Sequence, residues 1–341
     1  MPYTALSASA TSAYSDLLDA LLLAPFPARG LTFITRKVKG RTYWYLQHTI
    51  GADKRSYYLG PDSEDHRARI ARAQAALEAG SAEVETRRRL VRTGVAAGLA
   101  SPNAAETRVY EAMAQSGVFA AGGLLVGTHA YLALGNMLGV RWEAGARTED
   151  IDVGYTPAFD LAVPAQRTPL PEALREAGLD FIPVPALDSR LPPTEFRIRG
   201  QRLTVSLLTP LQGPPRSKPV EIPGLGHAEA LRFLDFLLED GQPVAIPAGS
   251  GVLAAAPAPG RFALHKLVVS QRRPAAMAGK SRKDLEQAAN VLSALADFRP
   301  GEIDAGLEAA RTQGGRFLEQ LRSGARALPQ ELRKWITDDS R

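Results

Sequence analysis

Two aspartates separated by one residue, Asp150 and Asp152, lie in the stretch Glu149–Val153 among apolar residues. If this stretch is a strand, both carboxylates project from one face while the residues between and after them point to a core. Two carboxylates on one face repel each other unless a cation lies between them, and Mg²⁺ prefers carboxylate ligands combined with substrate phosphates. The pair therefore indicates a candidate site for Mg²⁺ (or Mn²⁺), although the same pattern also occurs in loops that bind nothing.

A glycine-rich turn precedes this pair. Gly127 and Thr128 follow an apolar run and open a stretch whose apolar residues recur at helical spacing. Backbone N–H groups at such a helix N-terminus bind phosphate. The alternative is an ordinary strand-to-helix turn. The adjacent His129 is expected to be structural and is left out of the site.

The order of Gly-Thr turn, helix and D-x-D strand resembles the nucleotidyltransferase superfamily with a polymerase-beta-like core. The segments VGTHAY and RTEDID are most similar to bacterial nucleotidyltransferases of that superfamily, which resemble the abortive-infection type IV toxins. The resemblance covers roughly Ala104–Leu295. It implies a mixed sheet with flanking helices, an NTP as substrate and metal-dependent transfer.

A C-terminal segment extends the resemblance. In FALHKLVVSQRR and KSRKDLEQAANVL, Lys266 and Asp284 match the lysine and the acid that the toxin-like relatives place on consecutive helices after the sheet. A lysine is a compact positive charge suited to a triphosphate. On this pattern Gly127, Thr128, Lys266 and Lys283 bind the NTP, and Asp150, Asp152, Lys266 and Asp284 are catalytic. The alternative is a surface lysine and an aspartate that stabilises its own helix dipole.

A third carboxylate usually stands on a later strand in this superfamily. The matching stretch is Leu203–Pro210, and the position expected to be acidic is Ser206. Ser206 should share a face with the two aspartates, because its neighbours need the core. A hydroxyl is a weak Mg²⁺ ligand. The alternative function is therefore a catalytically weakened fold that acts as a nucleic-acid-binding or regulatory module.

The composition narrows the class of protein. The chain has 341 residues and no cysteine, which excludes disulfides, thiolate metal sites and cysteine nucleophiles. Asp16 and Asp19 interrupt the N-terminal apolar stretch and no basic segment precedes it, so we expect no signal peptide. No apolar run approaches the roughly 18 residues of a membrane span. We expect a cytoplasmic protein with no membrane partner, whose net charge of +5 permits an anionic one.

The periodicity predicts an α+β protein in three parts. Residues 1–100 hold a helix, a β-meander and a second helix; residues 101–256 form the nucleotidyltransferase core; and residues 257–341 are helical and complete the site. The first two parts are expected to contain these elements: helices Tyr3–Leu23, Asp62–Ala97, Ala104–Ser116 and Pro171–Ala177, the meander Leu31–Leu59, strands Val118–Leu125, Leu179–Pro183, Glu195–Arg199 and Arg202–Pro210, a helical piece Glu229–Leu238, and a hairpin Val244–Ala256.

The predicted meander is rich in basic and aromatic residues. They are Arg36, Lys37, Lys39, Arg41, Lys54 and Arg55, interleaved with Tyr43, Trp44, Tyr45, Tyr57 and Tyr58. Such interleaving suits a platform for single-stranded nucleic acid. The alternative is that the aromatic residues form the core of this small sheet and the cations its solvated face.

Together these patterns predict Mg²⁺-dependent transfer of a nucleotide from an NTP to an acceptor hydroxyl. The acceptor is an RNA or tRNA end, a protein side chain or a small molecule. The resemblance to toxins also implies an antitoxin protein as a partner.

Overall fold

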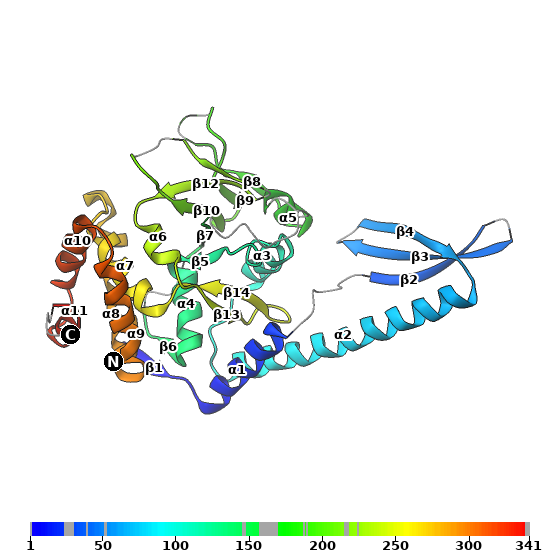
Figure 1. Cartoon of the computed structure of the whole chain (residues 1–341), viewed down its shortest axis with the longest axis horizontal. Coiled ribbons are helices and arrows are strands. Elements are labelled where there is room, and N and C mark those ends of the chain that lie inside the picture. Colours follow the sequence, from blue (N-terminus) through cyan, green and yellow to red (C-terminus); the bar gives the residue numbers. More distant parts are fainter. Residues whose placement is uncertain are drawn as a thin grey trace.

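The computed structural model of the chain describes residues 2–23, 31–38, 40–50, 53–144, 148–156, 170–186, 188, 190–214, 218–223 and 225–337. A mixed sheet lies at the centre of the molecule (Figure 1). Its strands are β5 (Leu124–Val126), β7 (Asp150–Gly154), β8 (Phe181–Pro183), β9 (Glu195–Ile198), β10 (Thr204–Pro210), β11 (Val220–Ile222) and β12 (Gly226–Leu231). They lie in the order β11, β12, β10, β7 and β5, with β9 beside β10 and β8 beside β9. Strands β7, β10 and β12 run parallel, and the other pairs are antiparallel.

Strands β7 and β10 form because apolar and polar residues alternate along both. Ile151 and Val153 in β7 are fully buried, as are their register partners Val205 and Leu207 in β10. The residues between them point to the opposite face. Because one face of the sheet is buried in the core, the polar side chains of β7 and β10 lie on the other face.

Helices pack around the sheet and form most of the chain from residue 259 onward. They are α3 (Ala104–Gln115), α4 (Gly127–Leu138), α5 (Leu170–Glu176), α6 (Leu234–Leu238), α7 (Pro259–Ser270), α8 (Ala278–Phe298), α9 (Pro300–Arg311), α10 (Gly315–Ala325) and α11 (Gln330–Thr337). The predicted hairpin is formed by β13 (Gln242–Ile246) and β14 (Val252–Ala256), and it packs near α4. One large hydrophobic core joins the sheet, α3, α4 and α7 to α9. No helix in the described part of the chain has the length and apolar character needed to cross a membrane.

The N-terminus differs from the prediction of a helix beginning at Tyr3. Tyr3–Ala5 is strand β1, which pairs with β6 (Val140–Trp142). Helix α1 begins only at Ala8, where the Ser7 hydroxyl accepts a hydrogen bond from the Ala10 N–H, and ends at Leu22. The first residues become extended because an edge strand distant in sequence is available to them, which a local pattern cannot reveal.

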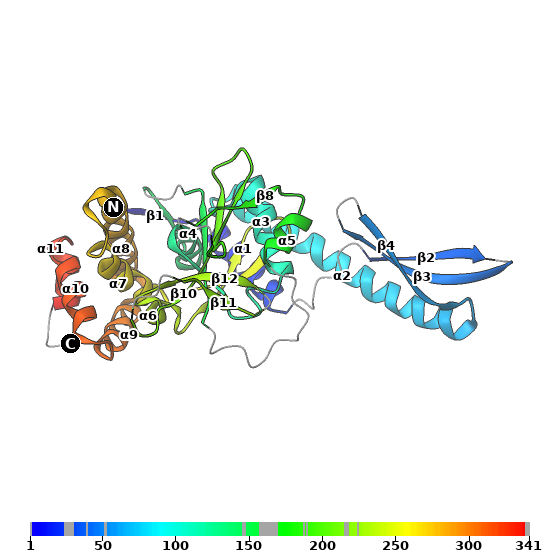
Figure 2. The ribbon, with the colours of Figure 1, turned by 90° about the horizontal axis from the view of Figure 1, so that it is seen from above.

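Residues 31–96 form an arm that projects from the rest of the molecule (Figures 1 and 2). Its three antiparallel strands confirm the predicted meander: β2 (Leu31–Val38), β3 (Arg41–Ile50) and β4 (Asp53–Pro61). We call β2, β3 and β4 the N-terminal sheet. The long helix α2 (Glu64–Ala96) begins at the far end of this sheet, capped by Ser63, and returns to pack on α1. Residues Tyr14, Leu17, Val91 and Leu99 form part of a second, smaller core there.

Two other predicted elements were wrong in part. Of the predicted strand Val118–Leu125, only the end is extended, in β5, and Val118 itself lies in a turn. The predicted helical piece Glu229–Leu238 divides into the end of β12 and the short helix α6. Residues 229–231 are extended because they pair with the end of β10. The boundaries of the three predicted domains stay a prediction.

Candidate active site

Strand β7 places the two predicted metal ligands on one face of the sheet. Asp150 is exposed at the start of the strand, and its Oδ1 accepts a hydrogen bond of 2.8 Å from the Thr204 hydroxyl. Asp152 is half-buried and lies opposite Ser206, whose hydroxyl donates to its carboxylate. Each aspartate is thus oriented by a hydroxyl from β10. Ser206 lies on the face predicted for it.

The environment of Asp152 disfavours its charged form. Burial, together with the negative charge of Asp150, raises the pKa of Asp152 to about 6. The positive charges of Lys266 and Lys280 and the hydrogen bond from Ser206 act in the opposite direction but do not outweigh burial. A carboxylate with a raised pKa beside a second one is the arrangement that a divalent cation relieves.

The Gly-Thr turn touches the carboxylate pair directly. Gly127 has φ +63°, a left-handed conformation that favours glycine, and a Cβ there would stand 2.8 Å from Asp152 Oδ2. Helix α4 begins at this residue, and no described side chain caps its N-terminus with a hydrogen bond. Its first N–H groups therefore face the carboxylate side of the sheet with no side-chain cap, as a helix that binds an anion requires.

Lys266 and Asp284, which the resemblance matches to a lysine and an acid on consecutive helices, form a buried ion pair. Lys266 Nζ lies 2.7 Å from Asp284 Oδ1, and both residues are under one-tenth exposed. The sequence interpretation missed a third member, Arg273, whose Nε donates to Asp284 Oδ2 at 2.8 Å. Burial alone would raise the pKa of Asp284, but the charges of Lys266 and Arg273 hold it below its ordinary value. The trio keeps one net positive charge.

Helix α8 joins this trio to the Gly-Thr turn through a buried polar row. Asp284, Gln287 and Asn290 follow one another at three-residue spacing along its inner face. Gln287 Nε2 lies 3.4 Å from the Thr128 hydroxyl, and Asn290 Nδ2 donates to the Tyr131 hydroxyl at 2.7 Å. Both partners lie on α4. The C-terminal helices are thereby hydrogen-bonded to the first turns of the helix beside the aspartates.

Two further lysines of α8 lie near the carboxylates. Lys280 is exposed and close enough to lower the pKa of Asp152. Lys283, predicted to bind the NTP, is partly buried; burial and the charge of Lys266 lower its pKa, while Asp284 and Asp150 raise it. The site therefore combines an acidic face on the sheet with a basic face on α7 and α8.

His129 lies beside the site as a buried side chain, which fits the structural role expected for it. It is 3 % exposed, and its Nδ1 lies 2.8 Å from the Tyr110 hydroxyl. Its Nε2 is buried with no hydrogen-bond partner among the described residues. Burial lowers the pKa of His129 to about 4, and the charged groups that act on it are Asp150 and Lys283. It is thus a neutral imidazole beside both faces of the site.

The described residues contain no cluster of three or more histidine and acidic side chains positioned to hold a metal ion. Ser206 lies in register with Asp152 and is not a carboxylate. The next carboxylate in the same row is Glu195, one strand further away on β9 and opposite Ser206. A metal ion would thus have two carboxylates from the protein, so its remaining ligands would come from substrate or water, as is usual for Mg²⁺.

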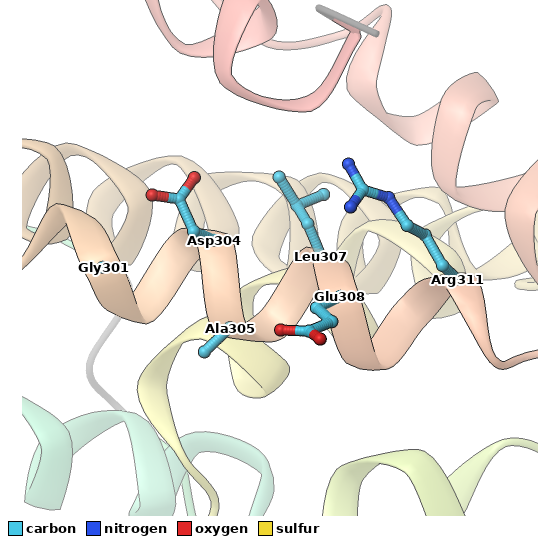
Figure 3. A pocket seen from close by; sticks show the side chains of 6 residues that line it. All are labelled: Gly301, Asp304, Ala305, Leu307, Glu308 and Arg311. Carbon is cyan, nitrogen blue, oxygen red and sulfur yellow. The ribbon is translucent and has the colours of Figure 1, made fainter. Parts of the chain in front are cut away.

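A concavity of about 740 Å³ lies elsewhere, along α9. It is lined by Gly301, Asp304, Ala305, Leu307, Glu308 and Arg311 (Figure 3). All of these residues come from one helix, and none belongs to the constellation around β7. The concavity has no evident part in the chemistry of the site.

The comparison with protein families decides the class of this site. A family model described as a nucleotidyltransferase matches residues 105–311. The chain belongs to this nucleotidyltransferase family. The match extends from α3 to α9 and includes every predicted site residue from Gly127 to Asp284. Searches of curated proteins and of solved structures gave no match. Nucleotidyl transfer is thus the class of activity that family membership supports.

Proposed function

We propose that this nucleotidyltransferase moves a nucleotide from an NTP to an acceptor hydroxyl in a Mg²⁺-dependent reaction. One observation carries the proposal. The paired aspartates on β7 adjoin the uncapped N-terminus of α4, and the C-terminal helices bring the Lys266–Asp284 pair to the same place. An anionic substrate that brings a divalent cation matches both halves of such a site.

The donor set fits Mg²⁺. Asp150 and Asp152 supply two hard oxygen ligands on one face, and the raised pKa of Asp152 reflects a negative charge that lacks compensation. Bound Mg²⁺ would neutralise charge on the triphosphate and withdraw electrons from the reacting phosphorus. Two carboxylates with substrate phosphates form a usual Mg²⁺ environment.

The other residues position the substrate. The N–H groups at Gly127 and Thr128 would hold phosphate oxygens, and Lys266 and Lys283 would offset the charge that develops as pyrophosphate leaves. Asp284 would hold Lys266 in place. The acceptor oxygen forms a bond to the α-phosphorus, and the bond from this phosphorus to pyrophosphate breaks. The hydroxyl proton passes to water, because residue 206 is a serine and not a carboxylate that could accept it.

The acceptor we favour is an RNA end, tRNA included, with a protein side chain or a small molecule as the other classes. A toxin role, an antitoxin partner and a cytoplasmic location rest on resemblance and composition. A second function is favoured by Ser206: a weakened fold that binds nucleic acid without turnover.

Incubation of the full-length protein with each α-labelled NTP, Mg²⁺ and total cellular RNA tests the proposal. We expect label to enter RNA, protein or small molecules in a reaction that EDTA stops and that Asp152→Asn abolishes. Asp16 is exposed on α1, so the control variant Asp16→Asn should transfer label as the parent protein does. RNA binding without any transfer of label would favour the second function instead.

A further inference from the structure

The positive charge of this protein is concentrated in the N-terminal sheet. Residues 31–61 contain six Lys and Arg residues and one Asp, which is a net charge of +5. The remainder of the chain has 35 basic and 35 acidic residues, so its net charge is zero. A surplus of this size in about thirty residues attracts an anionic partner to the arm and not to the molecule as a whole.

The two faces of this sheet have different surroundings. Trp44 on β3 points toward the start of α2, where its indole Nε1 donates to Asp62 Oδ1 at 2.9 Å. Because side chains alternate along a strand, Tyr43 and Tyr45 point to the opposite face. Cross-strand pairing places Arg36 on that face, opposite Tyr43. We call Arg36, Tyr43, Tyr45 and Ser56 the outer face of the N-terminal sheet.

An arginine lies across this outer face in a fixed orientation. The Arg36 guanidinium lies 5.1 Å from the centre of the Tyr45 ring and donates to the Ser56 hydroxyl at 3.0 Å. Tyr45 lies on the strand between those of Arg36 and Ser56, so the guanidinium spans the sheet. Arg36 and Ser56 are exposed, and Tyr43 and Tyr45 are partly exposed. The outer face therefore combines an exposed arginine with two partly exposed tyrosine rings.

The described aromatic residues of the N-terminal sheet are partly open to solvent. Phe33, Ile34, Tyr43, Trp44 and Tyr45 are all partly exposed, and none belongs to either hydrophobic core of the protein. Lys39 and the side chains of Lys54, Arg55, Tyr57 and Tyr58 lie outside the described residues. The alternative, in which the aromatic residues form the core of this small sheet, stays open.

We propose that the outer face of the N-terminal sheet binds single-stranded RNA, and so holds the acceptor for the transfer reaction. Planar aromatic rings and an arginine plane stack on unpaired bases, while the surrounding cations attract the phosphate chain. An anionic lipid surface or an acidic peptide would use the charge but not the rings. The role of the bound RNA as acceptor rests on the proposed function. The binding of RNA itself does not require catalysis.

The arginines at the C-terminal end of α2 differ and provide a control. Arg92 lies 2.7 Å from Glu85 and Arg88 lies 3.5 Å from the same carboxylate, so both are already paired. Arg87 is buried. They also lie on the part of α2 that packs on α1 and not beside the outer face. Removing a charge from Arg88 changes the net charge as Arg36→Ala does, at a site with no aromatic neighbour from the sheet.

Fluorescence anisotropy of the full-length protein with a labelled unstructured RNA oligonucleotide tests the proposal. We expect Arg36→Ala and Tyr45→Leu each to weaken RNA binding about 10-fold, in keeping with the loss of one stacking contact. Arg88→Ala should weaken it less than twofold. Binding by the parent should fall steeply with salt, and an RNA duplex of equal length should bind more weakly than the single strand. Single-stranded DNA tests whether the ribose hydroxyl is read.

Thermal melts and NTP binding should match the parent in the two sheet variants, which excludes misfolding as the cause. RNA affinity that Arg36→Ala and Arg88→Ala lower equally would overturn the proposal in favour of diffuse attraction. Binding to anionic vesicles with none to RNA would also overturn it. Asp152→Asn should bind RNA normally, so loss of transfer with retained RNA binding counts against the proposed function and not against this surface.

Discussion

Replacing Asp152 by Asn should make the metal-free protein more stable while removing its response to Mg²⁺ and NTP. The change keeps the shape of the side chain, and the amide oxygen can still accept the hydrogen bond from Ser206. What it removes is a charge that the folded protein accommodates poorly. The pKa of Asp152 is about 6 in the folded protein against an ordinary value of 3.8.

The size and sign of the effect follow from this shift. As the pH rises, an unfolded Asp ionises first, so folding loses stability between about pH 4 and pH 6 and stays less stable above. A shift of about two units corresponds to about 3 kcal/mol at pH 8 and, by the same linkage, about 1.5 kcal/mol at pH 5. These are upper bounds, because Asp152 is only half-buried and solvent screens part of the cost. Asparagine carries no such cost at either pH.

Thermal melts at pH 5 and pH 8, with EDTA and with Mg²⁺ and NTP, measure this effect. The melting temperature of Asp152→Asn should exceed that of the parent in EDTA, and by more at pH 8, since about 1 kcal/mol corresponds to roughly 2 °C in a protein of this size. With Mg²⁺ and NTP the parent should gain stability and the variant should not. Asp16→Asn should follow the parent throughout. Equal melting temperatures at pH 8, or unchanged Mg·NTP affinity, would refute the assignment of the pair.

Three other changes test the remaining parts of the site. Lys266→Met should lower the rate of nucleotide transfer about 100-fold or more, because it removes a charge that stabilises the transition state. Normal turnover in this variant would mean that Lys266 has only a structural role, as the ion-pair partner of Asp284. Ser206→Asp should destabilise the metal-free protein by adding a third acid, and Mg²⁺ should restore more stability to it than to the parent; an equal Mg²⁺ response would place residue 206 away from the metal. Gly127→Ala should weaken Mg·NTP binding, because the new Cβ would stand 2.8 Å from a carboxylate oxygen of the pair. Gly178 has a similar positive φ, +69° against +63°, with open space around it, so Gly178→Ala should cost stability alone.

Several parts of the fold could be predicted because they depend on residues close together in sequence. The alternation in Glu149–Val153 indicated both the strand and the shared face of its aspartates, since the period of a strand is two residues. The periodicity of Leu31–Leu59 likewise indicated the meander of β2 to β4. Residues 257–341 were predicted to be helical, and Asp284 in helix α8 proved to be buried.

The errors arose where an element depends on a distant partner. Tyr3–Ala5 is extended because it pairs with β6, and residues 229–231 are extended because they pair with the end of β10. Local propensity is similar for helix and strand in such short apolar segments, so pairing decides between them.

The sequence alone determined the chemical character of the site: two acids separated by one residue, a Gly-Thr turn, and a lysine and an acid in the expected order. The tertiary structure decided which other residues join them. Arg273 reaches Asp284 from the linker after α7, Gln287 reaches Thr128 from α8, and Tyr110 orients His129 from α3. These contacts join residues up to 159 positions apart. Only the packing of helices on a common core brings them within hydrogen-bond distance, because no periodicity along the chain encodes which side chains will meet.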